Sequence, residues 1–540
     1  MTGRELVRSA MRLGEVERAP WVPFVGCHGG SLVGLDASAY LASAEAVVRG
    51  AAEAVRRYRP DGIPVFFDLQ VEAEALGCRL VWAPQNPPAV VSHPLAEGKS
   101  LGDLAVPGPG GGRLPVALEA ARRLRAAHPD LALYGLVTGP FTLALHLAGT
   151  DLFMRLYDDE KGVHDLLAFC RGVSSAVSRY YLEAGCDVVA LVDPMTSQIG
   201  PGQFRQFVTG PVSEVFSEVR RRGGLGSFFV CGHAQQNVEA MCECRPDNIS
   251  IDENIPLDFV RDICLPRGIS FGGNLKLTVV LLMGGPADAQ KNALECLEAG
   301  GGRGFILAPG CDLPYATPPD NLEAVARVVR DPYEREVART MERHEDVESV
   351  LDMSQYGRTD RVIVDIITLD SESCAPCQYM VESVRRVAPQ FEGVVEWREH
   401  KIKKRESVQF MTSLMVRNIP TICIDGTITF VSRIPPKEEL VAAIQKRIYE
   451  KLRYRIRTKR GEVLVLGRTS EECRGVREVV RQALVELGSD AAVTEVTDGR
   501  DLLAYGVTRT PAVVAVSYRV KHEGGVPPLA VVKEWLKDLA

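Results

Sequence analysis

Short apolar runs alternate with longer amphipathic stretches over the first 335 residues. The runs are rich in β-branched and aromatic residues, as buried strands are, and the stretches between them have the spacing of helices with one apolar face. Predicted helices include 37–58, 161–184, 202–222 and 286–299. Strands that alternate with helices predict a parallel sheet, and eight such repeats predict a (β/α)8 TIM barrel. The eight predicted strands span residues 21–26, 61–67, 132–137, 187–193, 226–232, 248–253, 269–274 and 304–310.

Polar residues follow these predicted strands, at the end of a TIM barrel that carries the active site. An Asp after a strand is also a common helix N-cap, so each position alone has a structural alternative. Two thiols stand out, Cys231 and Cys311, because thiols at the ends of buried strands can hold zinc and activate a sulfur nucleophile. The strand-end residues are Cys27, His28, Asp68, Thr138, Asp193, Cys231, His233, Asp252, Asn274 and Cys311.

Composition and charge are those of a globular protein of about three domains. The chain has 540 residues, is 46% hydrophobic and carries a formal net charge of −7, which gives no reason to expect a nucleic-acid or anionic-membrane partner. Its apolar runs fall short of the roughly 18 residues of a membrane span. The first residues lack the apolar core of a signal peptide, and we expect a cytoplasmic protein. Its 14 cysteines then indicate reduced thiols, metal ligands or redox motifs.

The pattern changes after the charged segment 331–358, which predicts a helix leading into a linker. A predicted strand at 361–369 precedes Cys374-Ala375-Pro376-Cys377, which opens a helix through about residue 388. The helix N-terminus is expected to lower the pKa of Cys374 and make it an attacking thiolate, with Cys377 as the resolving thiol. A C-x-x-C is alternatively half of a zinc site, but the Ile-Pro-Thr step at Pro420 favours a redox pair.

Residues 460–540 repeat this plan with strands at 462–467 and 492–496 around a helix at 471–487, followed by Thr510-Pro511. The dithiol position is occupied by Ser470-Glu471-Glu472-Cys473. Because the first cysteine is replaced by serine, a disulfide cannot form within this motif. Three roles stay open for Cys473, which are a single working thiol, exchange with the Cys374/Cys377 pair, or a structural role.

Six segments of the first 335 residues resemble the uroporphyrinogen decarboxylase superfamily, and most of all its cobalamin-dependent branch, which includes the methylcobalamin:coenzyme M methyltransferases. They are PFVGCHGGSLVG near the start, DGIPVFFDLQVEAEALGC at 61–78, GLVTGPFTLALHLAGTDLF at 135–153, NISIDENI at 248–255, GGNL at 272–275 and LAPGCDLPYATPPDNLEA at 307–324.

The remainder resembles the thioredoxin/glutaredoxin fold twice, and in that fold the prolines at positions like Pro420 and Pro511 are cis and lie beside the dithiol. The resemblances predict a TIM barrel followed by two thioredoxin-like α/β domains. The predicted divisions are 1–335 for the barrel, 336–358 for the linker, 359–452 for the CAPC domain and 453–540 for the SEEC domain.

The barrel resemblance implies methyl transfer between a corrinoid cobalt and a small thiol. An Asp-x-His-x-x-Gly corrinoid motif is missing from the sequence, so the methylcobalamin would be a free substrate or arrive on a partner corrinoid protein. The family holds zinc with a His-x-Cys strand end and a later Gly-Cys. Here Cys231 and Cys311 are kept, but Phe229 occupies the histidine position. Three outcomes stay open: His233 or His28 is the third ligand, the site binds metal differently, or it has lost zinc. Asp68 and Glu72 would orient the substrate, and the other strand-end residues would line the site.

Two alternatives remain. A uroporphyrinogen-type decarboxylase would need the arginine-rich segment that grips substrate carboxylates, and residues 24–30 contain no arginine. A non-catalytic barrel coupled to a thioredoxin-like oxidoreductase is favoured by Phe229 and Ser470. We further expect Cys374→Ser to impair turnover without changing the metal content of the barrel.

Overall fold

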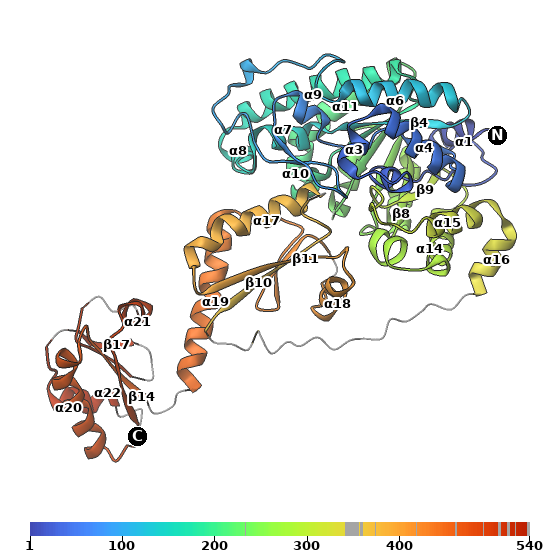
Figure 1. Cartoon of the computed structure of the whole chain (residues 1–540). Coiled ribbons are helices and arrows are strands. Elements are labelled where there is room, and N and C mark those ends of the chain that lie inside the picture. The colour runs from blue at the N-terminus through green and yellow to red at the C-terminus, as the bar shows by residue number, and fades with distance from the viewer. Residues whose placement is uncertain are drawn as a thin grey trace. The chain divides into compact units, whose positions relative to one another are not determined.

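The computed structural model describes the chain except residues 233, 341–355, 357–359, 373, 417, 459–461, 490, 506–508, 516–518, 524 and 537–540, and it leaves out the side chains of 453–458, 500, 503–504 and 519–523. The described residues belong to two compact units (Figure 1). The first unit spans 1–352, 364–386 and 397–436, and the second spans 353–363, 387–396 and 437–540.

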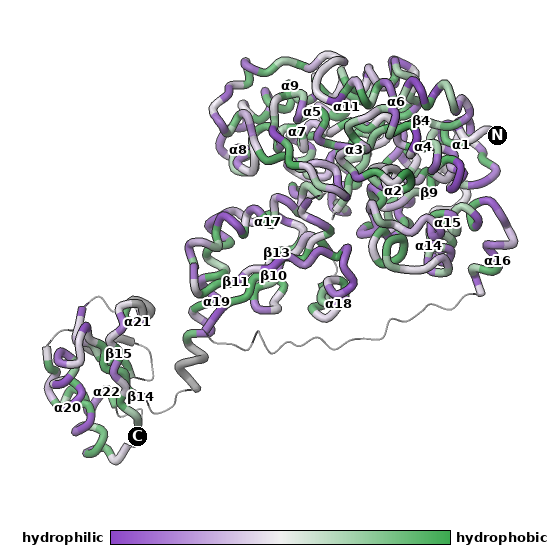
Figure 2. Tube along the Cα trace, in the orientation of Figure 1, coloured by the Kyte–Doolittle hydropathy of each residue, from purple (hydrophilic) through white to green (hydrophobic). Residues whose placement is uncertain are grey.

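Seven parallel strands of the first unit are hydrogen-bonded in chain order. Each overlaps one predicted run, and β4, β6 and β8 extend one residue beyond it. The continuous apolar residues of these runs are buried on both faces of a parallel sheet. Figure 2 shows this apolar character along β4 and β9. The strands are β1 Gly62–Pro64, β4 Ala132–Thr138, β5 Val188–Val192, β6 Leu225–Val230, β7 Asn248–Ile251, β8 Ser270–Leu275 and β9 Phe305–Pro309.

The eighth position of the barrel is filled by residues 20–22 rather than by the full predicted strand 21–26. Trp21 forms a parallel bridge with Leu307, and the Leu307 N–H donates to the Pro20 carbonyl at 2.9 Å. On the other side, the Asp61 N–H donates to the Trp21 carbonyl at 2.8 Å. Pro20 and Pro23 lack an N–H, which shortens the ladder. The segment still joins β9 to the start of β1, so the predicted TIM barrel is confirmed.

Helices cover the outside of the barrel, and α1 Gly3–Met11 packs into its interior cluster. The predicted helix 37–58 is interrupted, because Asp36 and Ser43 each cap a new helix start through their side chains. The covering helices are α3 Ala37–Leu41, α4 Ala44–Tyr58, α6 Leu114–Ala127, α7 Pro140–Ala148, α9 Glu160–Glu183, α11 Thr209–Arg221, α13 Leu257–Cys264, α14 Pro286–Gly300, α15 Pro319–Arg330 and α16 Pro332–Thr340. Most of the predicted linker after α16 lies outside the described residues.

The predicted strand and helix around the C-x-x-C are β10 Val362–Thr368 and α17 Ala375–Val387. They belong to a four-stranded sheet of order β11-β10-β12-β13, in which β12 is antiparallel to both of its neighbours. The Ile419–Pro420 peptide bond is cis, as expected. The other elements are β11 Val395–Lys401, α18 Arg405–Ser413, β12 Thr421–Ile424, β13 Thr427–Val431 and α19 Lys437–Thr458.

The last 80 residues repeat this topology with the sheet order β15-β14-β16-β17. The same strand order in two consecutive sheets confirms two thioredoxin-like domains, and the Thr510–Pro511 bond is also cis. The elements are β14 Glu462–Leu466, α20 Ser470–Glu486, β15 Ala492–Val496, α21 Gly499–Ala504, β16 Ala512–Ala515, β17 Arg519–Glu523 and α22 Leu529–Leu536.

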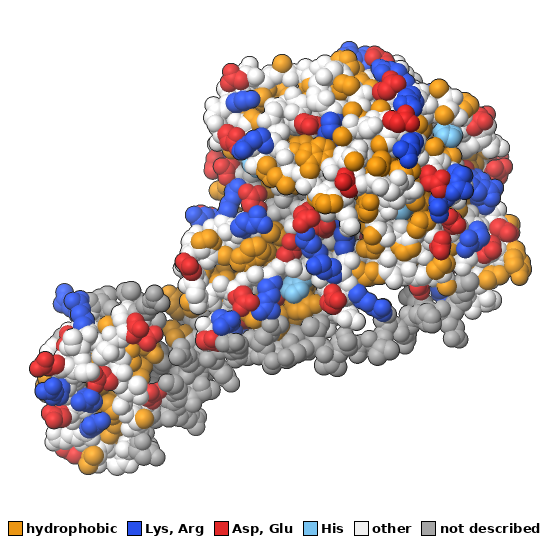
Figure 3. All heavy atoms as spheres, viewed as in Figure 1, with side chains coloured by type: hydrophobic (Ala, Val, Ile, Leu, Met, Phe, Trp, Pro, Cys, Tyr) orange, Lys and Arg blue, Asp and Glu red, His pale blue; other side chains and the backbone are white. Residues whose placement is uncertain are grey.

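The described surface carries both signs of charge. On the face drawn in Figure 3, Lys and Arg side chains are interspersed with Asp and Glu side chains. Among the described residues, no helix is both long enough and apolar enough to span a membrane.

Candidate active site

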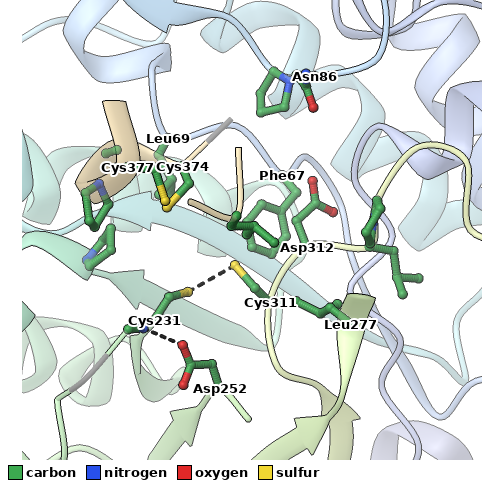
Figure 4. Close-up of a pocket in the computed structure, with 18 of the residues that line it drawn as sticks. Phe67, Leu69, Asn86, Cys231, Asp252, Leu277, Cys311, Asp312, Cys374 and Cys377 are labelled. Atoms are coloured by element: carbon green, nitrogen blue, oxygen red, sulfur yellow. Dashed lines mark hydrogen bonds between the residues drawn. The ribbon is translucent and has the colours of Figure 1, made fainter. Parts of the chain in front are cut away.

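The two strand-end thiols of the barrel meet at its carboxyl end. Cys231 follows β6 and Cys311 follows β9, and their sulfurs are 3.0 Å apart although 80 residues separate them in the chain. Figure 4 shows the two side chains pointing toward each other. Both line a cavity of about 120 Å³, and both are partly exposed. The parallel sheet therefore builds a pair of neighbouring thiols at the barrel mouth.

The C-x-x-C pair lines the same cavity. Cys374 and Cys377 come from the start of α17, and Pro420 lies beside them in the lining. In Figure 4 the two sulfurs approach the cavity from the side opposite Cys231 and Cys311. Cys374 is partly exposed, whereas Cys377 is fully buried. The cavity is therefore lined by these four thiols, from two parts of the first unit, and by Cys27.

Contacts between α17 and the barrel hold the second pair in place. Tyr379 is fully buried within the core of the barrel, and its hydroxyl lies 3.3 Å from Nδ1 of His146. Burial lowers the pKa of His146 to about 3, so the imidazole is neutral and Nδ1 can accept the Tyr379 proton. Gln378 Nε2 donates to the Val90 carbonyl at 2.6 Å. Burial of a tyrosine at this contact makes the docking of α17 part of the folded core.

Carboxyl groups surround the barrel thiols. Asp252 accepts a hydrogen bond from the Gly232 N–H and two at 2.9 Å from Asn254. Burial raises the pKa of Asp252 to about 6 and that of Glu253 to about 8. Asp312 accepts from the Gly26 N–H at 2.8 Å, and burial raises its pKa to about 8. Asp68 accepts from Arg113 at 2.5 Å.

The described lining has one cationic side chain, Lys403, and it is already hydrogen-bonded to Asn86 and Asp370. Together with the carboxyl groups, this makes the cavity poor in groups that would bind an anion.

The predicted site residues divide into two groups. Cys27, Asp68, Asp252, Cys231, Cys311, Cys374, Cys377 and Pro420 line the cavity. His233 lies outside the described residues. Glu72, Thr138, Asp193, Asn274 and His28 are not among the lining residues.

Residues of the second group have structural partners. Glu72 accepts from Thr138, Asp193 accepts from the backbone of Phe141 and Thr142 at the start of α7, and Asn274 donates to the carbonyls of Asp252 and Ile255. His28 places its ring nitrogens 2.6 Å from the Tyr58 hydroxyl and 3.2 Å from the Tyr315 carbonyl.

The sequence reasoning missed several polar lining residues, among them Asn86, Glu253, Asp312 and Lys403. A signal existed for Glu253 and Asp312, because they directly follow Asp252 and Cys311, which were predicted. Asn86 and Lys403 lie in loops without a strand or helix pattern to mark them. They pair across the cavity edge at 2.8 Å, and only the fold brings them together.

The zinc set implied by the resemblance does not fit the described residues. Phe229 points into the barrel interior, where its ring packs 5.1 Å from Phe24 and 6.3 Å from Phe67. A phenyl ring has no lone pair to donate, and both nitrogens of His28 are engaged. Among the described residues, no group of three or more His, Cys, Asp and Glu side chains is arranged to hold a metal ion. Two thiols alone do not complete a zinc site.

The thiol pKa values differ from the expectation for Cys374. Its hydrogen bond with Cys377 and its burial raise the pKa of Cys374 above the ordinary value, whereas a lowered pKa was expected from the helix N-terminus. A hydrogen bond with Cys311 and burial likewise raise the pKa of Cys231. Cys374 and Cys231 are therefore mostly protonated while each is hydrogen-bonded to its partner thiol.

The second thioredoxin-like domain has no comparable pair. Cys473 is fully buried, and its sulfur lies 3.9 Å from the Val465 carbonyl. Ser470 begins α20 at the position of the missing thiol, with Thr469 as the helix cap. This geometry supports a structural role for Cys473.

Comparison with known proteins gives two family matches. A family model described as uroporphyrinogen decarboxylase (URO-D) matches residues 2–332, and a thioredoxin domain model matches residues 461–537. Methylcobamide:CoM methyltransferase MtbA of Methanosarcina mazei is 26% identical over 339 residues, which cover 61% of this chain and 98% of the relative. The MtaA protein of Methanosarcina barkeri is 28% identical over 290 residues, which cover 52% and 83%. The solved structure of a methyltransferase from Methanosarcina mazei matches with a TM-score of 0.58 and 25% identity, covering 62% of this chain and 99% of that one.

Proposed function

The chain belongs to the uroporphyrinogen decarboxylase (URO-D) family, and on this premise we propose that its barrel transfers a methyl group between a corrinoid and a thiol. The relatives named methylcobamide:CoM methyltransferases support this reaction. The observation that carries it is the meeting of Cys231 and Cys311 at 3.0 Å in the cavity at the barrel mouth. The divisions 1–335, 336–358, 359–452 and 453–540 are part of the same proposal.

The reaction breaks the cobalt–carbon bond and forms a sulfur–carbon bond, so the acceptor thiol must lose its proton. Asp252 is buried at the cavity, and its hydrogen bond to the residue after Cys231 places it to accept that proton. Cys231 and Cys311 offer two soft ligands to a thiophilic metal. Zinc remains part of the proposal only if His233 or a substrate group completes the set, and no step is derived through it. The corrinoid would enter as free methylcobalamin or on a partner protein.

The charge of the cavity bears on the acceptor. Of the four carboxyl groups in its described lining, Glu253 and Asp312 have pKa values of about 8 and are largely neutral at pH 7, and Asp68 is paired with Arg113. The one cation of this lining, Lys403, is already paired with Asp370, so the described lining offers an anionic group no unpaired positive charge. We therefore propose an acceptor thiol without an anionic group. The same lining disfavours the alternative of a uroporphyrinogen-type decarboxylase, whose substrate carries several carboxylates and would lack an arginine clamp.

The test is methyl transfer from methylcobalamin with two thiols that share the same two-carbon chain, 2-mercaptoethanol with a neutral hydroxyl and 2-mercaptoethanesulfonate with an anionic sulfonate. We expect turnover with the neutral thiol and a rate at least about tenfold lower with the sulfonate, a difference of about 1.4 kcal/mol in barrier. Cys231→Ser and Cys311→Ser should lose the activity. Cys186→Ser, which changes a buried thiol before β5 at the other end of the barrel, is the matched control.

If neither thiol is methylated, even with added zinc, the result would favour the alternative of a non-catalytic barrel. Formation of a decarboxylated porphyrinogen would revive the decarboxylase.

A further inference from the structure

Two cysteine pairs from different parts of the chain face one cavity, and the proposed methyl transfer uses only the barrel pair. We propose that Cys374 and Cys377 reduce a disulfide between Cys231 and Cys311, so that the chain carries its own reductase for the barrel thiols. The proposal goes beyond the proposed function and does not depend on it, because the exchange involves protein sulfurs alone.

The barrel pair, Cys231 and Cys311, is placed to form a disulfide. The two sulfurs are 3.0 Å apart and both are partly exposed, so a disulfide of about 2.05 Å requires a closure of about 1 Å. In the described part of the chain, the other close sulfur pair of the barrel, Cys242 and Cys264, is 3.8 Å apart and buried. An oxidant that enters the cavity therefore meets Cys231 and Cys311 before Cys242 and Cys264.

The C-x-x-C pair is placed to reach that disulfide. Cys374 lines the same cavity as Cys231 and Cys311, and all three thiols are partly exposed. Pro420, the cis proline beside the dithiol, lines the cavity as well. In this proposal Cys231 is the sulfur that is attacked.

The docking of α17 turns this dithiol inward. Tyr379 is buried in the barrel core, and Gln378 donates to the Val90 carbonyl. Asn86 of the barrel side donates to Asp370 at 3.1 Å, directly before the dithiol segment. Since the active-site face of α17 is covered by the barrel, the sulfurs within reach of Cys374 are those inside the cavity.

The exchange balances in two steps. The Cys374 thiolate attacks the Cys231 sulfur, a Cys374–Cys231 disulfide forms, and Cys311 leaves and takes up the proton lost by Cys374. The Cys377 thiolate then attacks Cys374, and Cys231 leaves and takes up the proton lost by Cys377. Two electrons and two protons pass to the barrel pair, and the oxidised Cys374–Cys377 pair is restored by an external dithiol.

The test is disulfide mapping of the full-length chain. Wild type, Cys374→Ser and Cys377→Ser are oxidised with diamide, quenched in acid, alkylated and analysed by mass spectrometry of their peptides. In wild type we expect the disulfide at Cys374–Cys377. In Cys377→Ser, which lacks the resolving thiol, we expect a peptide that links Cys374 to Cys231. In Cys374→Ser we expect the Cys231–Cys311 disulfide to persist.

Cys423→Ser is the matched control, because Cys423 is a buried thiol of β12 in the same sheet and does not line the cavity. It should keep the wild-type pattern. Cys377→Ala serves as a second variant if Cys377→Ser does not fold. The proposal is overturned if Cys374 links to no barrel cysteine in both Cys377 variants, or if wild type keeps Cys231–Cys311 oxidised while Cys374 and Cys377 stay reduced. No methyl donor is present, so these outcomes are independent of the methyl-transfer assay.

Discussion

Phe229 occupies the place where a nitrogen ligand would complete the set begun by Cys231 and Cys311. Its ring belongs to the interior cluster against which both thiols pack. We predict that Phe229→His raises the zinc affinity of the chain, because an imidazole replaces a ring that cannot ligate. The expected gain in zinc affinity is at least about tenfold. Removing a residue that only hydrogen-bonds a zinc ligand already lowers metal affinity by about tenfold or more, so an added ligand should change the affinity at least as much. Metal analysis after equilibration with limiting zinc measures it.

Phe228→His is the control for this substitution. Phe228 is the neighbouring residue on β6, and it faces the outer helices, where its ring packs 6.1 Å from Phe204 and 5.9 Å from Phe216. A histidine there cannot reach the barrel thiols and should not change zinc content. Equal zinc in both variants would mean that the two thiols are not the metal site.

Glu72 predicts a dependence of stability on pH. Burial raises its pKa to about 7. Thr138 has one hydroxyl proton and lies 2.7 Å from both the Leu69 carbonyl and Glu72. A protonated Glu72 can donate to Thr138 while Thr138 donates to Leu69. The folded state thus binds a proton that the unfolded state, with a carboxyl pKa near 4.3, has lost. The stabilisation is complete below about pH 4.3 and is lost as the pH rises through about 7.

Glu72→Gln should remove this dependence, because the amide donates in place of the protonated carboxyl. The wild-type melting temperature is expected to fall between pH 6 and pH 8 more steeply than that of Glu72→Gln. Glu119→Gln, at an exposed position of α6, should follow wild type. Parallel melting curves for wild type and Glu72→Gln across this pH range would contradict the assignment.

Residue positions were only partly predictable from the sequence. Strand ends mark the edge of a parallel sheet, and Asp68, Cys231, Asp252 and Cys311 lie there as expected and line the cavity. The strand end does not fix the direction of a side chain. Asp193 follows β5 and Asn274 lies near the end of β8, but Asp193 bonds to the start of α7 and Asn274 to the loop after β7, because buried polar groups take the nearest partners.

At the scale of elements, α17 shows how the part of the chain that carries the C-x-x-C is attached to the barrel. The Tyr379 side chain is fully buried in the barrel core, although α17 follows β10 of the four-stranded sheet and is not a helix of the barrel. Tyr379→Ala should cost about 3–5 kcal/mol of unfolding free energy, as for other buried aromatics. We also expect faster alkylation of Cys377, which is buried while α17 is docked. Denaturant unfolding and the rate of Cys377 labelling measure the two effects.

Tyr449→Ala is the matched change on α19, where the tyrosine is 62% exposed. It should change stability by less than about 0.5 kcal/mol, as surface substitutions do. A Tyr379 variant with wild-type stability and labelling would mean that the α17 contact is not maintained in solution.

The elements themselves followed from the sequence pattern where apolar runs were continuous. The strand at 492–496 and the helix over 161–184 agree with β15 and α9 to within a residue at each end. The predicted strand 21–26 became a bridge because prolines flank it, and the predicted helix 37–58 broke at a serine that caps the next helix. Prolines and capping side chains therefore set where the elements end, whereas the hydrophobic periodicity predicted their order along the chain. The docking of α17 on the barrel had no periodic signal, because it depends on single contacts such as Tyr379.

At the scale of the whole molecule, exposure sorts the thiols. All 14 cysteines are free, and the three that are partly exposed, Cys231, Cys311 and Cys374, line one cavity. The others are buried, which shields their sulfurs from alkylating reagents.

We therefore predict that the native protein shows a fast phase of about three thiols in alkylation with a small reagent, and that all react after unfolding. Cys374→Ser should lower the number of fast-reacting thiols by one, whereas Cys473→Ser should leave it unchanged because the Cys473 side chain of α20 is fully buried. Peptide mapping of the labelled sites identifies the thiols. Fast labelling of Cys473 would contradict its structural role and make the second thioredoxin-like domain a reactive one. Fast labelling confined to the three cavity thiols would mean that the accessible thiols of the chain all line one cavity.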